Sequence, residues 1–587
     1  MSDYSFATTP HTLPASWRPL DCAVYRWVLA HGGSALLART AACASAAHGD
    51  GDTALLLRQA GASVAGAMPL NAEDIAALRA ETMVAANDEG PVRPFVLDAD
   101  DRFYLWRNRR DESQVIASLR ARRDAAQTLD VDTADIDVLF AGDASDAVTP
   151  QRAAVRQVAG KRLFVLTGGP GTGKTTTVLR MLLLLQRRAG TSLNIVAAAP
   201  TGKAAQRLTQ ALREGAQALR ANGGIVSTSD GGACLDAIPQ AASTLHRLLG
   251  MGGHGGPRAG APLAADVVVV DEASMIDLAM LRALLDALRE DAALILVGDA
   301  DQLASIGAGA VLTDLVAALE ADPRDDLVRL HHVFRSQHAL AAIHQSVRSG
   351  DAAAFRAAWQ AAGDAAIRHR VTDLPTLARH IDAWSQSLLT AAAPPHPDGD
   401  SAHTTAAVSA ALRTLTQRQL LCALHEGPFG ALAVAARIDR HLRRVRGSDD
   451  DSPWYHGRAI LILHNDYHAQ LFNGDVGLCL HDATGVPRVW FAASDGSVRA
   501  VAIEQLPAHE SAWAITIHKS QGSEYDHVAV LLPPSPDNPI LNRELLYTAL
   551  SRARTRVELW SSEEATAAAL NRSTTRAGGL AARLRGC

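Results

Sequence analysis

One segment of eight residues, GGPGTGKT at 168–175, constrains the fold of this chain more than any other. It follows an apolar run typical of a buried strand and precedes a helical pattern at 175–188. Glycines at these places let backbone N–H groups wrap phosphate oxygens, and the start of the helix adds a favourable dipole. An ordinary glycine turn is the alternative, but both flanking elements of a phosphate-binding loop are present. The residues expected to hold a nucleotide are Gly168, Gly169, Pro170, Gly171, Thr172, Gly173, Lys174, Thr175 and Thr176.

The chemistry expected of this loop extends to two later strand ends. Lys174 is expected to bridge the β- and γ-phosphates of ATP, and Thr175 to ligate Mg²⁺. Asp271 and Glu272 end the apolar run VVVV, and two buried carboxylates are costly without a cation. We therefore expect Asp271 to hold Mg²⁺ and Glu272 to polarise the attacking water. Gln302 follows a further apolar run, ALILVGDAD, and is placed to report on the γ-phosphate.

The bulk composition excludes some classes of protein. The chain has 587 residues, too many for one hydrophobic core, so about three or four domains are expected. No apolar run approaches the ~20 residues that span a bilayer, and the first ten residues lack a signal peptide's basic start. We therefore expect a cytoplasmic protein without membrane contact. The six cysteines are scattered, which favours unpaired thiols over a metal site. With a net charge of −6, any nucleic-acid contact must be a local groove.

Strand and helix patterns alternate in two parts of the chain. Apolar runs at 162–166, 194–198, 266–270 and 293–297 are separated by helical segments, and a second set lies at 527–532 and 555–560. Such unbroken apolar strands predict parallel sheets covered on both faces, so the fold class is α/β with two lobes. Short strand and turn patterns at 457–502 predict a small β insertion, and the first ~149 residues are mainly helical in pattern. The glycine- or proline-rich stretches 221–232, 250–262 and 391–403 are expected to be loops.

A P-loop alone indicates only nucleotide binding, so later motifs decide the class. The segments AITIHKSQGSEYD and LLYTALSRARTR match patterns of superfamily 1 helicases, and the chain also has APTGKAAQRL. Together with STLHRLLG, DEASMID, GDADQLAS and NDYHAQLFNGDVG, in this order, they closely resemble the RecD family, the α subunits of exodeoxyribonuclease V (RecBCD). The resemblance is strongest across 151–560. It extends more weakly to WRPLDCAVYRWV and RPFVLDADDRFYLWR near the start and to GGLAARL near the end.

The resemblance implies an ATP-dependent DNA helicase that moves from 5′ toward 3′ and serves a complex that processes double-strand DNA ends for recombinational repair. Implied partners are single-stranded and duplex-end DNA, and RecB-like and RecC-like subunits in a heterotrimer. Nuclease activity would belong to a partner, because no carboxylate-and-lysine nuclease pattern lies outside the ATPase motifs. The expected domains are a partner-docking N-terminal domain (1–145), RecA-like lobe 1 (146–330), RecA-like lobe 2 (331–445 and 505–565), an SH3-like β insertion (446–504) and a C-terminal tail (566–587).

The resemblance also gives roles to matching residues. Gln151 would read the adenine edge and Glu524 would contact the ribose. Arg335 and Arg552 would reach the γ-phosphate from the second lobe, where fixed guanidinium groups stabilise the charge of the transferring phosphoryl group. The residues expected to contact the DNA strand are Thr201, Lys203, Thr244, His246, Thr516, His518 and Lys519. For each threonine and histidine of this set, a packing role is the alternative.

Two departures from the family pattern and two rival functions remain open. Gly307 stands where the family commonly has Glu, which could alter a contact between lobes or with DNA, and Ser551 replaces a frequent Thr while keeping the hydroxyl. A stand-alone RecD-like helicase is the first rival, although such proteins carry helix-hairpin-helix repeats in a longer N-terminal region whose pattern is not found here. The second rival is a P-loop scaffold that binds ATP and recruits partners. Stimulation of ATP turnover by DNA separates it from a motor.

Overall fold

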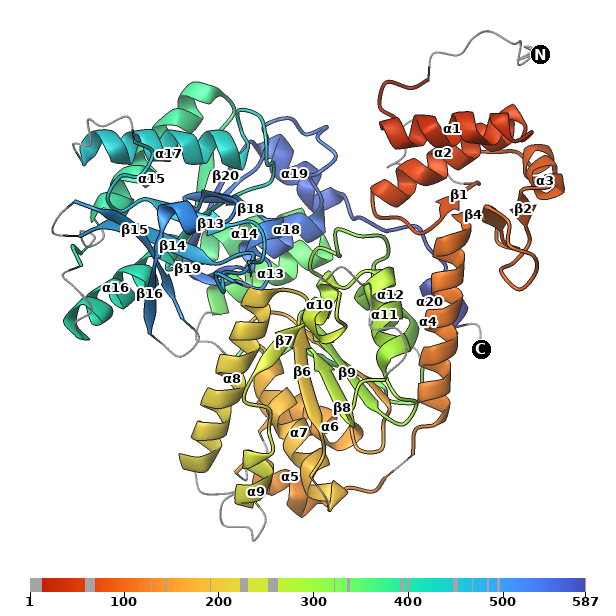
Figure 1. Cartoon of the computed structure of the whole chain (residues 1–587), viewed down its shortest axis with the longest axis horizontal. Coiled ribbons are helices and arrows are strands. Elements are labelled where there is room, and N and C mark those ends of the chain that lie inside the picture. The colour runs from red at the N-terminus through yellow and green to blue at the C-terminus, as the bar shows by residue number, and fades with distance from the viewer. Residues whose placement is uncertain are drawn as a thin grey trace.

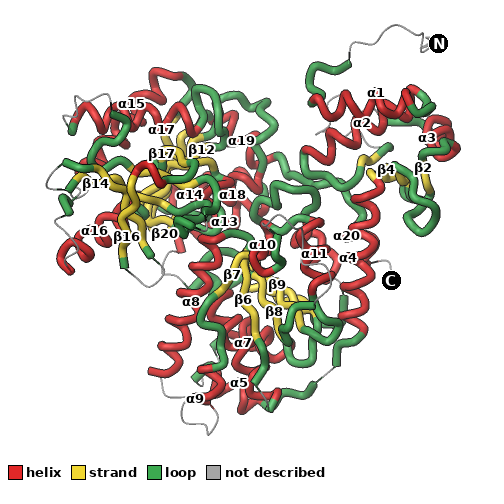
Figure 2. The backbone as a smooth tube through the Cα atoms, in the orientation of Figure 1, coloured by secondary structure: helices red, strands yellow, loops and turns green. Residues whose placement is uncertain are grey.

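A computed structural model describes residues 13–58, 69–127, 129–141, 143, 145–190, 192–221, 231–251, 262–320, 322–334, 338–390, 395–397, 402–446, 452–466, 468–482, 485–493 and 497–585. Figure 1 shows a small N-terminal domain beside a lower α/β lobe (lobe 1), with a second α/β lobe (lobe 2) and an antiparallel sheet on the other side. Helices cover the sheets of both lobes (Figure 2). No helix within these residues is long and apolar enough to cross a membrane.

Lobe 1 is built on a six-stranded parallel sheet. Its strands, in the order β10-β5-β9-β8-β6-β7, are β5 (Leu163–Gly168), β6 (Ile195–Ala199), β7 (Ala242–Thr244), β8 (Val267–Val270), β9 (Ala293–Gly298) and β10 (Leu327–Leu330). Its helices are α5 (Thr133–Leu139), α6 (Thr149–Gln157), α7 (Lys174–Ala189), α8 (Gly202–Ala221), α9 (Gly231–Asp236), α10 (Leu245–Leu248), α11 (Leu278–Ala287) and α12 (Val311–Leu319), with short 3-10 turns η1 (Asp146–Val148) and η2 (Ala273–Met275). The four predicted strands are confirmed within one or two residues, because each is a continuous buried run.

Successive residues of these strands belong to two separate cores. Phe164 and Leu166 pack with α6, α7 and α8 on one face of the sheet, and Val165 packs with α11 and α12 on the other. The second core also includes side chains from segments distant in sequence. These are Leu119, which belongs to the N-terminal domain, and Leu584, which lies near the C-terminus. Lobe 1 is therefore completed by parts of the chain that lie far from it in sequence.

Lobe 2 has a five-stranded parallel sheet in the order β11-β20-β19-β12-β18. Its strands are β11 (Ala366–Arg370), β12 (Arg418–Cys422), β18 (Ala514–Thr516), β19 (Tyr525–Leu531) and β20 (Ala553–Ser561). Its helices are α13 (His338–Ser349), α14 (Ala352–Ala361), α15 (Leu374–Thr390), α16 (Ala402–Leu415), α17 (Ala431–Val445), α18 (Arg543–Leu550) and α19 (Glu563–Asn571), with 3-10 turns η3 (Gly363–Ala365) and η5 (His518–Ser520). The second set of predicted strands is thus confirmed in the same sheet type as lobe 1.

The predicted β insertion is a five-stranded antiparallel sheet in the order β16-β15-β14-β13-β17. Its strands are β13 (Ala459–Ile462), β14 (Val476–His481), β15 (Pro487–Ala492), β16 (Val498–Ala502) and β17 (His509–Ser511), with the turn η4 (Ile503–Gln505) before β17. One face packs on its own small core and the other on α16. The insertion is therefore anchored to lobe 2 by a helix as well as by chain connections.

The N-terminal domain combines helices with a small sheet that its helical pattern did not predict. The helices are α1 (Pro19–Ala30), α2 (Ala35–Gly49), α3 (Ala72–Ala80) and α4 (Trp106–Asp124). The strands, in the order β1-β4-β3-β2, are β1 (Leu55–Leu56), β2 (Val84–Ala85), β3 (Phe95–Leu97) and β4 (Arg102–Leu105). Strands of two to four residues are too short to show a clear period of two. The last helix, α20 (Leu580–Arg585), lies against α4 and α12 (Figure 1).

The three predicted loops fall largely outside the residues that the structure describes, so the structure does not test them.

Candidate nucleotide and nucleic-acid site

The segment 168–175 joins the end of β5 to the start of α7. Gly171 and Gly173 have φ values of 73° and 81°, a left-handed backbone that glycine adopts without strain. The Nζ atom of Lys174 donates to the carbonyl oxygens of Gly168 at 2.6 Å and Gly169 at 3.1 Å. The ammonium group therefore lies folded over the loop, within reach of any phosphate that the loop wraps.

A cleft of about 430 Å³ opens beside this loop between the two lobes. Lobe 1 contributes Asp271, Glu272 and Gln302 to its wall, and lobe 2 contributes Glu524 and Arg552. The loop residues that line the cleft are Pro170, Gly171, Thr172, Gly173, Lys174, Thr175 and Thr176. Most of the residues predicted for nucleotide chemistry are thus brought to one cavity.

The two carboxylates stand directly after β8. Burial raises the pKa of Asp271, as does the neighbouring Glu272, while Lys174 acts in the opposite direction. Glu272 has a φ of 53°, an uncommon conformation for a residue with a side chain, and its N–H donates to Oδ1 of Asp271 at 2.9 Å. A bound divalent cation would stabilise the charged form of Asp271, so the Asp271 and Thr175 oxygens fit Mg²⁺.

Gln302 belongs to a polar group that crosses between the lobes. Its Nε2 donates to Oδ2 of Asp299 at 3.1 Å, and the hydroxyl of Tyr547, on α18 of lobe 2, donates to the same oxygen at 2.8 Å. The buried Oε1 of Gln302 has no hydrogen-bond partner among the described residues. One half of this amide is therefore fixed and the other half is free for a ligand or water. Tyr547 was not predicted as a site residue, and its position in the motif LLYTALSRAR is its one distinguishing feature in the sequence.

Leu303, the next residue, is held by lobe 2 on both sides of its peptide unit. Its N–H donates to Oγ1 of Thr548 at 2.8 Å, and its carbonyl accepts from Nε2 of Gln521 at 3.1 Å. Both backbone groups of Leu303 are thus hydrogen-bonded to lobe 2.

Of the two predicted arginines, only Arg552 can be placed. Its guanidinium is buried and donates to the carbonyls of Thr548 at 3.1 Å and Ser523 at 3.2 Å, whereas Nη2 has no partner in the described part of the chain. An oriented, incompletely satisfied guanidinium at a phosphate cleft suits a developing negative charge. Arg335 lies outside the described residues.

Gln151 lies beneath the loop, and the structure does not place it on the cleft wall. Its Nε2 donates to the carbonyl of Thr172 at 3.0 Å, and its Oε1 accepts from Arg180 at 3.2 Å. A Cβ atom at Gly173 would come within 2.5 Å of this amide, so the glycine is required by close packing as well as by backbone conformation. Its contact with adenine stays a prediction.

Glu524 is ion-paired across the cleft. Arg207 of α8 contacts it from lobe 1, and Nε of Arg554 lies 3.0 Å from Oε2 on the lobe 2 side. Burial lowers the pKa of Arg207, but the nearby carboxylates together raise it above its ordinary value. Glu524 contributes most among them, and Glu272 and Asp271 also lie close enough to raise this pKa. Arg207 is a site residue that motif reasoning missed, although it lies one turn beyond Lys203 in APTGKAAQRL.

The predicted DNA-contacting residues lie at the starts of α8 and α10 and around η5, and the hydrogen bonds of the three threonines are local. The hydroxyls of Thr201, Thr244 and Thr516 accept backbone N–H groups three residues ahead, which is the behaviour of helix and turn caps. Nζ of Lys203 lies 5.7 Å from the centre of the Tyr525 ring. Figure 1 shows α10 at the end of the lobe 1 sheet that faces lobe 2.

The remaining residues of this set differ in exposure. His246 and Lys519 are exposed, and Nζ of Lys519 donates to Glu510 at 2.6 Å. Burial lowers the pKa of the half-buried His518, and the charge of Arg576 lowers it further. The structure thus shows the threonine hydroxyls as caps of helices and turns, and DNA contact stays a prediction for the whole set.

Two family models match the two lobes. The AAA domain matches residues 151–308, and the UvrD-like helicase C-terminal domain matches residues 511–559. These matches cover the phosphate-binding loop, both carboxylates, Gln302, Glu524 and Arg552.

Curated relatives match over most of the chain. The chain is 38% identical over 543 residues to RecBCD enzyme subunit RecD of Mycobacterium tuberculosis, covering 88% of this chain and 86% of that one. It is 32% identical to the RecD subunit of Haemophilus influenzae, covering 73% and 71%. An ATP-dependent RecD2 DNA helicase of Deinococcus radiodurans is 30% identical, covering 69% of this chain and 48% of that protein.

Among solved structures, the Pif1 helicase from Bacteroides in complex with ADP-AlF3 and single-stranded DNA is similar at 17% identity. The TM-score is 0.35, and the match covers 75% of this chain and 94% of that one.

Proposed function

The chain belongs to the RecD family and is an ATP-dependent DNA helicase, and from that premise we propose that it moves along single-stranded DNA from 5′ toward 3′ within a heterotrimer of RecB-like and RecC-like subunits. One observation carries the motor part of the proposal. Groups from both lobes meet on a single cleft beside the phosphate-binding loop, so that ligand binding there must act on the distance between the lobes.

Each residue of the cleft would have a separate role in ATP hydrolysis. Lys174 would turn from the loop carbonyls to the β- and γ-phosphates, and Glu272 would orient and polarise the attacking water. Thr175 and Asp271 would hold Mg²⁺, which when bound neutralises phosphate charge. Arg552 would stabilise charge on the transferring phosphoryl group from the lobe 2 side. The Nη2 atom of Arg552 has no partner among the described residues, which supports this role. The Oε1 atom of Gln302 is likewise unpartnered there, which supports its predicted contact with the γ-phosphate or the water.

The contacts of Leu303 would couple phosphate binding at Gln302 to movement of lobe 2. Since its peptide unit binds Thr548 and Gln521, a shift of Gln302 on phosphate binding or release would displace lobe 2. Repeated closing and opening of the cleft would then advance the lobes along the strand. Contacts to sugar and phosphate by Lys203 and Lys519 would be independent of sequence.

The β insertion lies beside the predicted DNA residues. A Cβ atom at Gly202, at the start of α8, would lie 3.1 Å from Cβ of Phe472, and the Lys203 side chain packs at about 4 Å from the Cβ position of Gly474. This closeness supports a part for the insertion in guiding or splitting the DNA.

A subunit of a complex is favoured over a stand-alone helicase by the degree of similarity. The chain is 38% identical to the Mycobacterium tuberculosis RecD subunit over 88% of its length, and 30% identical to the Deinococcus radiodurans RecD2 helicase over 69% of its length. Unwinding of duplexes with 5′ or 3′ overhangs, by the chain alone and with candidate partner subunits, tests both direction and partnership. Full 5′–3′ unwinding by the isolated chain would weaken the subunit assignment, and preference for a 3′ overhang would contradict the direction.

The ATPase assignment is tested by Lys174→Ala. The variant should lose most ATP hydrolysis and keep its fold, because among the described residues the Lys174 ammonium hydrogen-bonds to loop carbonyls and faces the cleft. Turnover is measured with and without single-stranded DNA, and circular dichroism checks the fold. Turnover equal to that of the wild-type chain would refute the assignment, and failure of DNA to stimulate the wild-type chain would favour a scaffold.

A further inference from the structure

The end of the chain returns from lobe 2 to lobe 1 and the N-terminal domain. After α19 it runs to α20, which lies beside α4 and α12 (Figure 1). Leu580 and Leu584 are buried in the lobe 1 core on that side. Gly578 and Gly579 pass where side chains cannot fit, since a Cβ would come 2.6 Å from Oγ1 of Thr53 and 2.4 Å from the Tyr104 hydroxyl, respectively. The motif GGLAARL therefore encodes a docked tail.

Arg576, just before these glycines, hydrogen-bonds to the loop that follows Gln302. Its Nη2 donates to the carbonyl of Ser305 at 2.5 Å, and its Nη1 donates to the carbonyls of Gly307 at 2.6 Å and Gly309 at 3.1 Å. One guanidinium thus binds three backbone carbonyls of a loop (305–309, the sensor loop) that has no regular secondary structure. Only arginine has a planar array of donors that can do this.

The N-terminal domain meets the same loop and the same arginine. The N–H of Gly309 donates to the carbonyl of Gly51 at 2.8 Å, and a Cβ at Gly51 would lie 2.5 Å from Cζ of Arg576. The tail backbone is bound in turn, because the N–H of Ala577 donates to Oδ1 of Asp52 at 2.8 Å. The tail and the N-terminal domain therefore both bind one short loop and also bind each other.

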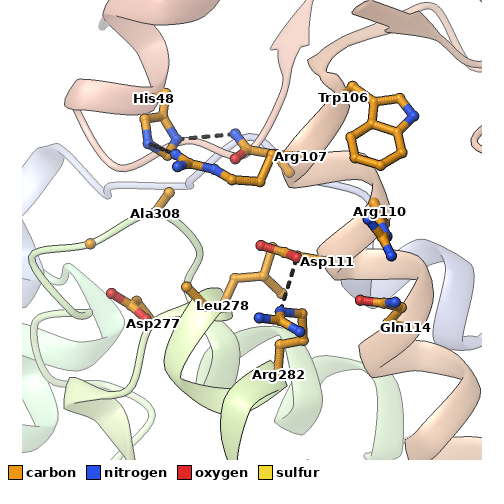
Figure 3. A pocket seen from close by; sticks show the side chains of 13 residues that line it. His48, Trp106, Arg107, Arg110, Asp111, Gln114, Asp277, Leu278, Arg282 and Ala308 are labelled. Carbon is orange, nitrogen blue, oxygen red and sulfur yellow. Dashed lines mark hydrogen bonds and ion pairs between the residues drawn. The ribbon is translucent and has the colours of Figure 1, made fainter. Parts of the chain in front are cut away.

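Close by, the N-terminal domain and lobe 1 are separated by a groove of about 530 Å³ (Figure 3). Arg107 and His48 lie on one side of it, and Asp277 and Ala308 on the other (Figure 3). An ion pair of 3.1 Å between Asp111 and Arg282 crosses it. The cluster at Arg576 thus joins the N-terminal domain to lobe 1 at a second place, in addition to α4, whose Leu119 packs in the lobe 1 core.

The sensor loop lies between the ATP site and the predicted DNA contacts. It begins three residues after Gln302, and Leu303 between them is bound to lobe 2. On the DNA side, Nε2 of Gln521 donates to the carbonyl of Leu303 at 3.1 Å, and Gln521 ends the turn that holds the predicted DNA contacts His518 and Lys519. A displacement of the loop would therefore shift residues at both the ATP site and the predicted DNA site.

We propose that Arg576 is a positioning residue that sets the sensor loop, and that through it the tail and the N-terminal domain control how strongly DNA binding accelerates ATP hydrolysis. This inference rests on the proposed helicase function. Arg576 lies outside the nucleotide cleft, so its loss changes the coupling between DNA and ATP and not the chemistry itself.

The test compares full-length chains carrying Arg576→Met or Arg576→Lys with the wild-type chain. Turnover of ATP is measured without DNA and with saturating oligo-thymidylate. Arg576→Met should reduce DNA-stimulated kcat by roughly tenfold, with basal turnover and KM for ATP within about twofold of wild type, because hydrogen bonds from a charged donor are lost at the loop only. Arg576→Lys keeps the charge but can satisfy fewer carbonyls, so it should give an intermediate value.

Arg572→Met is the matched control. It removes an arginine from the same tail whose hydrogen bond is to the exposed carbonyl of Asn538 at 3.0 Å, and its stimulation should equal that of wild type. Hydrogen exchange of the Gly309 amide supplies a readout independent of activity, and exchange should be faster in Arg576→Met only.

The outcomes separate this inference from the proposed function. If DNA does not stimulate the wild-type chain, the helicase proposal fails and this inference fails with it. If the wild-type chain is stimulated and Arg576→Met is stimulated equally, only the inference is refuted. Equal loss of basal and stimulated turnover, with a lower melting temperature, would show a merely structural role and would also refute it.

Discussion

Replacing Gly307 with alanine should destabilise the start of α11, although glycine stands here in a loop without regular secondary structure. A Cβ at this position would lie 2.0 Å from Oδ2 of Asp277 and 2.8 Å from its Cβ and Cγ. Asp277 is not free to move without loss, because its Oδ1 accepts the N–H of Met280 at 2.7 Å and caps α11. The family's usual glutamate at this position would meet the same obstacle.

The size of the effect follows from these contacts. Displacing the cap costs about 1 kcal/mol, and forcing an extra carbon into a filled space costs roughly 1–3 kcal/mol. Against this, alanine restricts the unfolded chain and returns ~0.4–1 kcal/mol. The net loss should be about 2 kcal/mol. In an Asp277→Gly background the obstacle is absent, and glycine at the cap itself costs only a few tenths of a kcal/mol, so Gly307→Ala should there be nearly neutral.

Native-state hydrogen exchange of the α11 amides measures this locally, which suits a chain of several lobes that need not unfold together. The four proteins form a double-mutant cycle, and the expected coupling between positions 277 and 307 is about 2 kcal/mol. A loss below ~0.5 kcal/mol in the wild-type background, or an equal loss in both backgrounds, would refute the reasoning.

Two further predictions concern Asp314 and Lys203. Burial, and then Glu112, raise the pKa of Asp314 to about 7 from an ordinary value of 3.8, although Arg576 and Arg585 act against this. The folded chain therefore binds a proton that the unfolded chain has released between these values, and stability falls as pH rises across that window. Asp314→Asn should thus raise the melting temperature relative to wild type at pH 8 more than at pH 5, by the equivalent of ~1–3 kcal/mol, and an equal difference at both pH values would contradict this. Lys203→Ala should weaken binding to single-stranded DNA and lower the slope of log affinity against log salt concentration by roughly 0.7, measured by fluorescence anisotropy. An unchanged slope would remove Lys203 from the DNA contact.

Local patterns were enough to predict the α/β elements and much of the nucleotide site. The strands were predictable because each buried strand of a parallel sheet is a continuous apolar run. Lys174, Asp271 and Glu272 were predictable because loops at the carboxyl ends of such strands converge on one edge of the sheet. The very short strands of the N-terminal domain were not predictable, since two to four residues carry no period.

The sequence by itself therefore determined the phosphate-binding loop of this helicase, the two lobes around it and the family to which the motifs belong. Tertiary structure alone decided which distant residues complete the site. Arg207 pairs with Glu524, Tyr547 binds Asp299, and Arg576 binds a loop some 270 positions earlier. Such contacts follow from how whole surfaces pack and from which carbonyls and carboxylates packing leaves unsatisfied. Spacing along the chain carries no record of either.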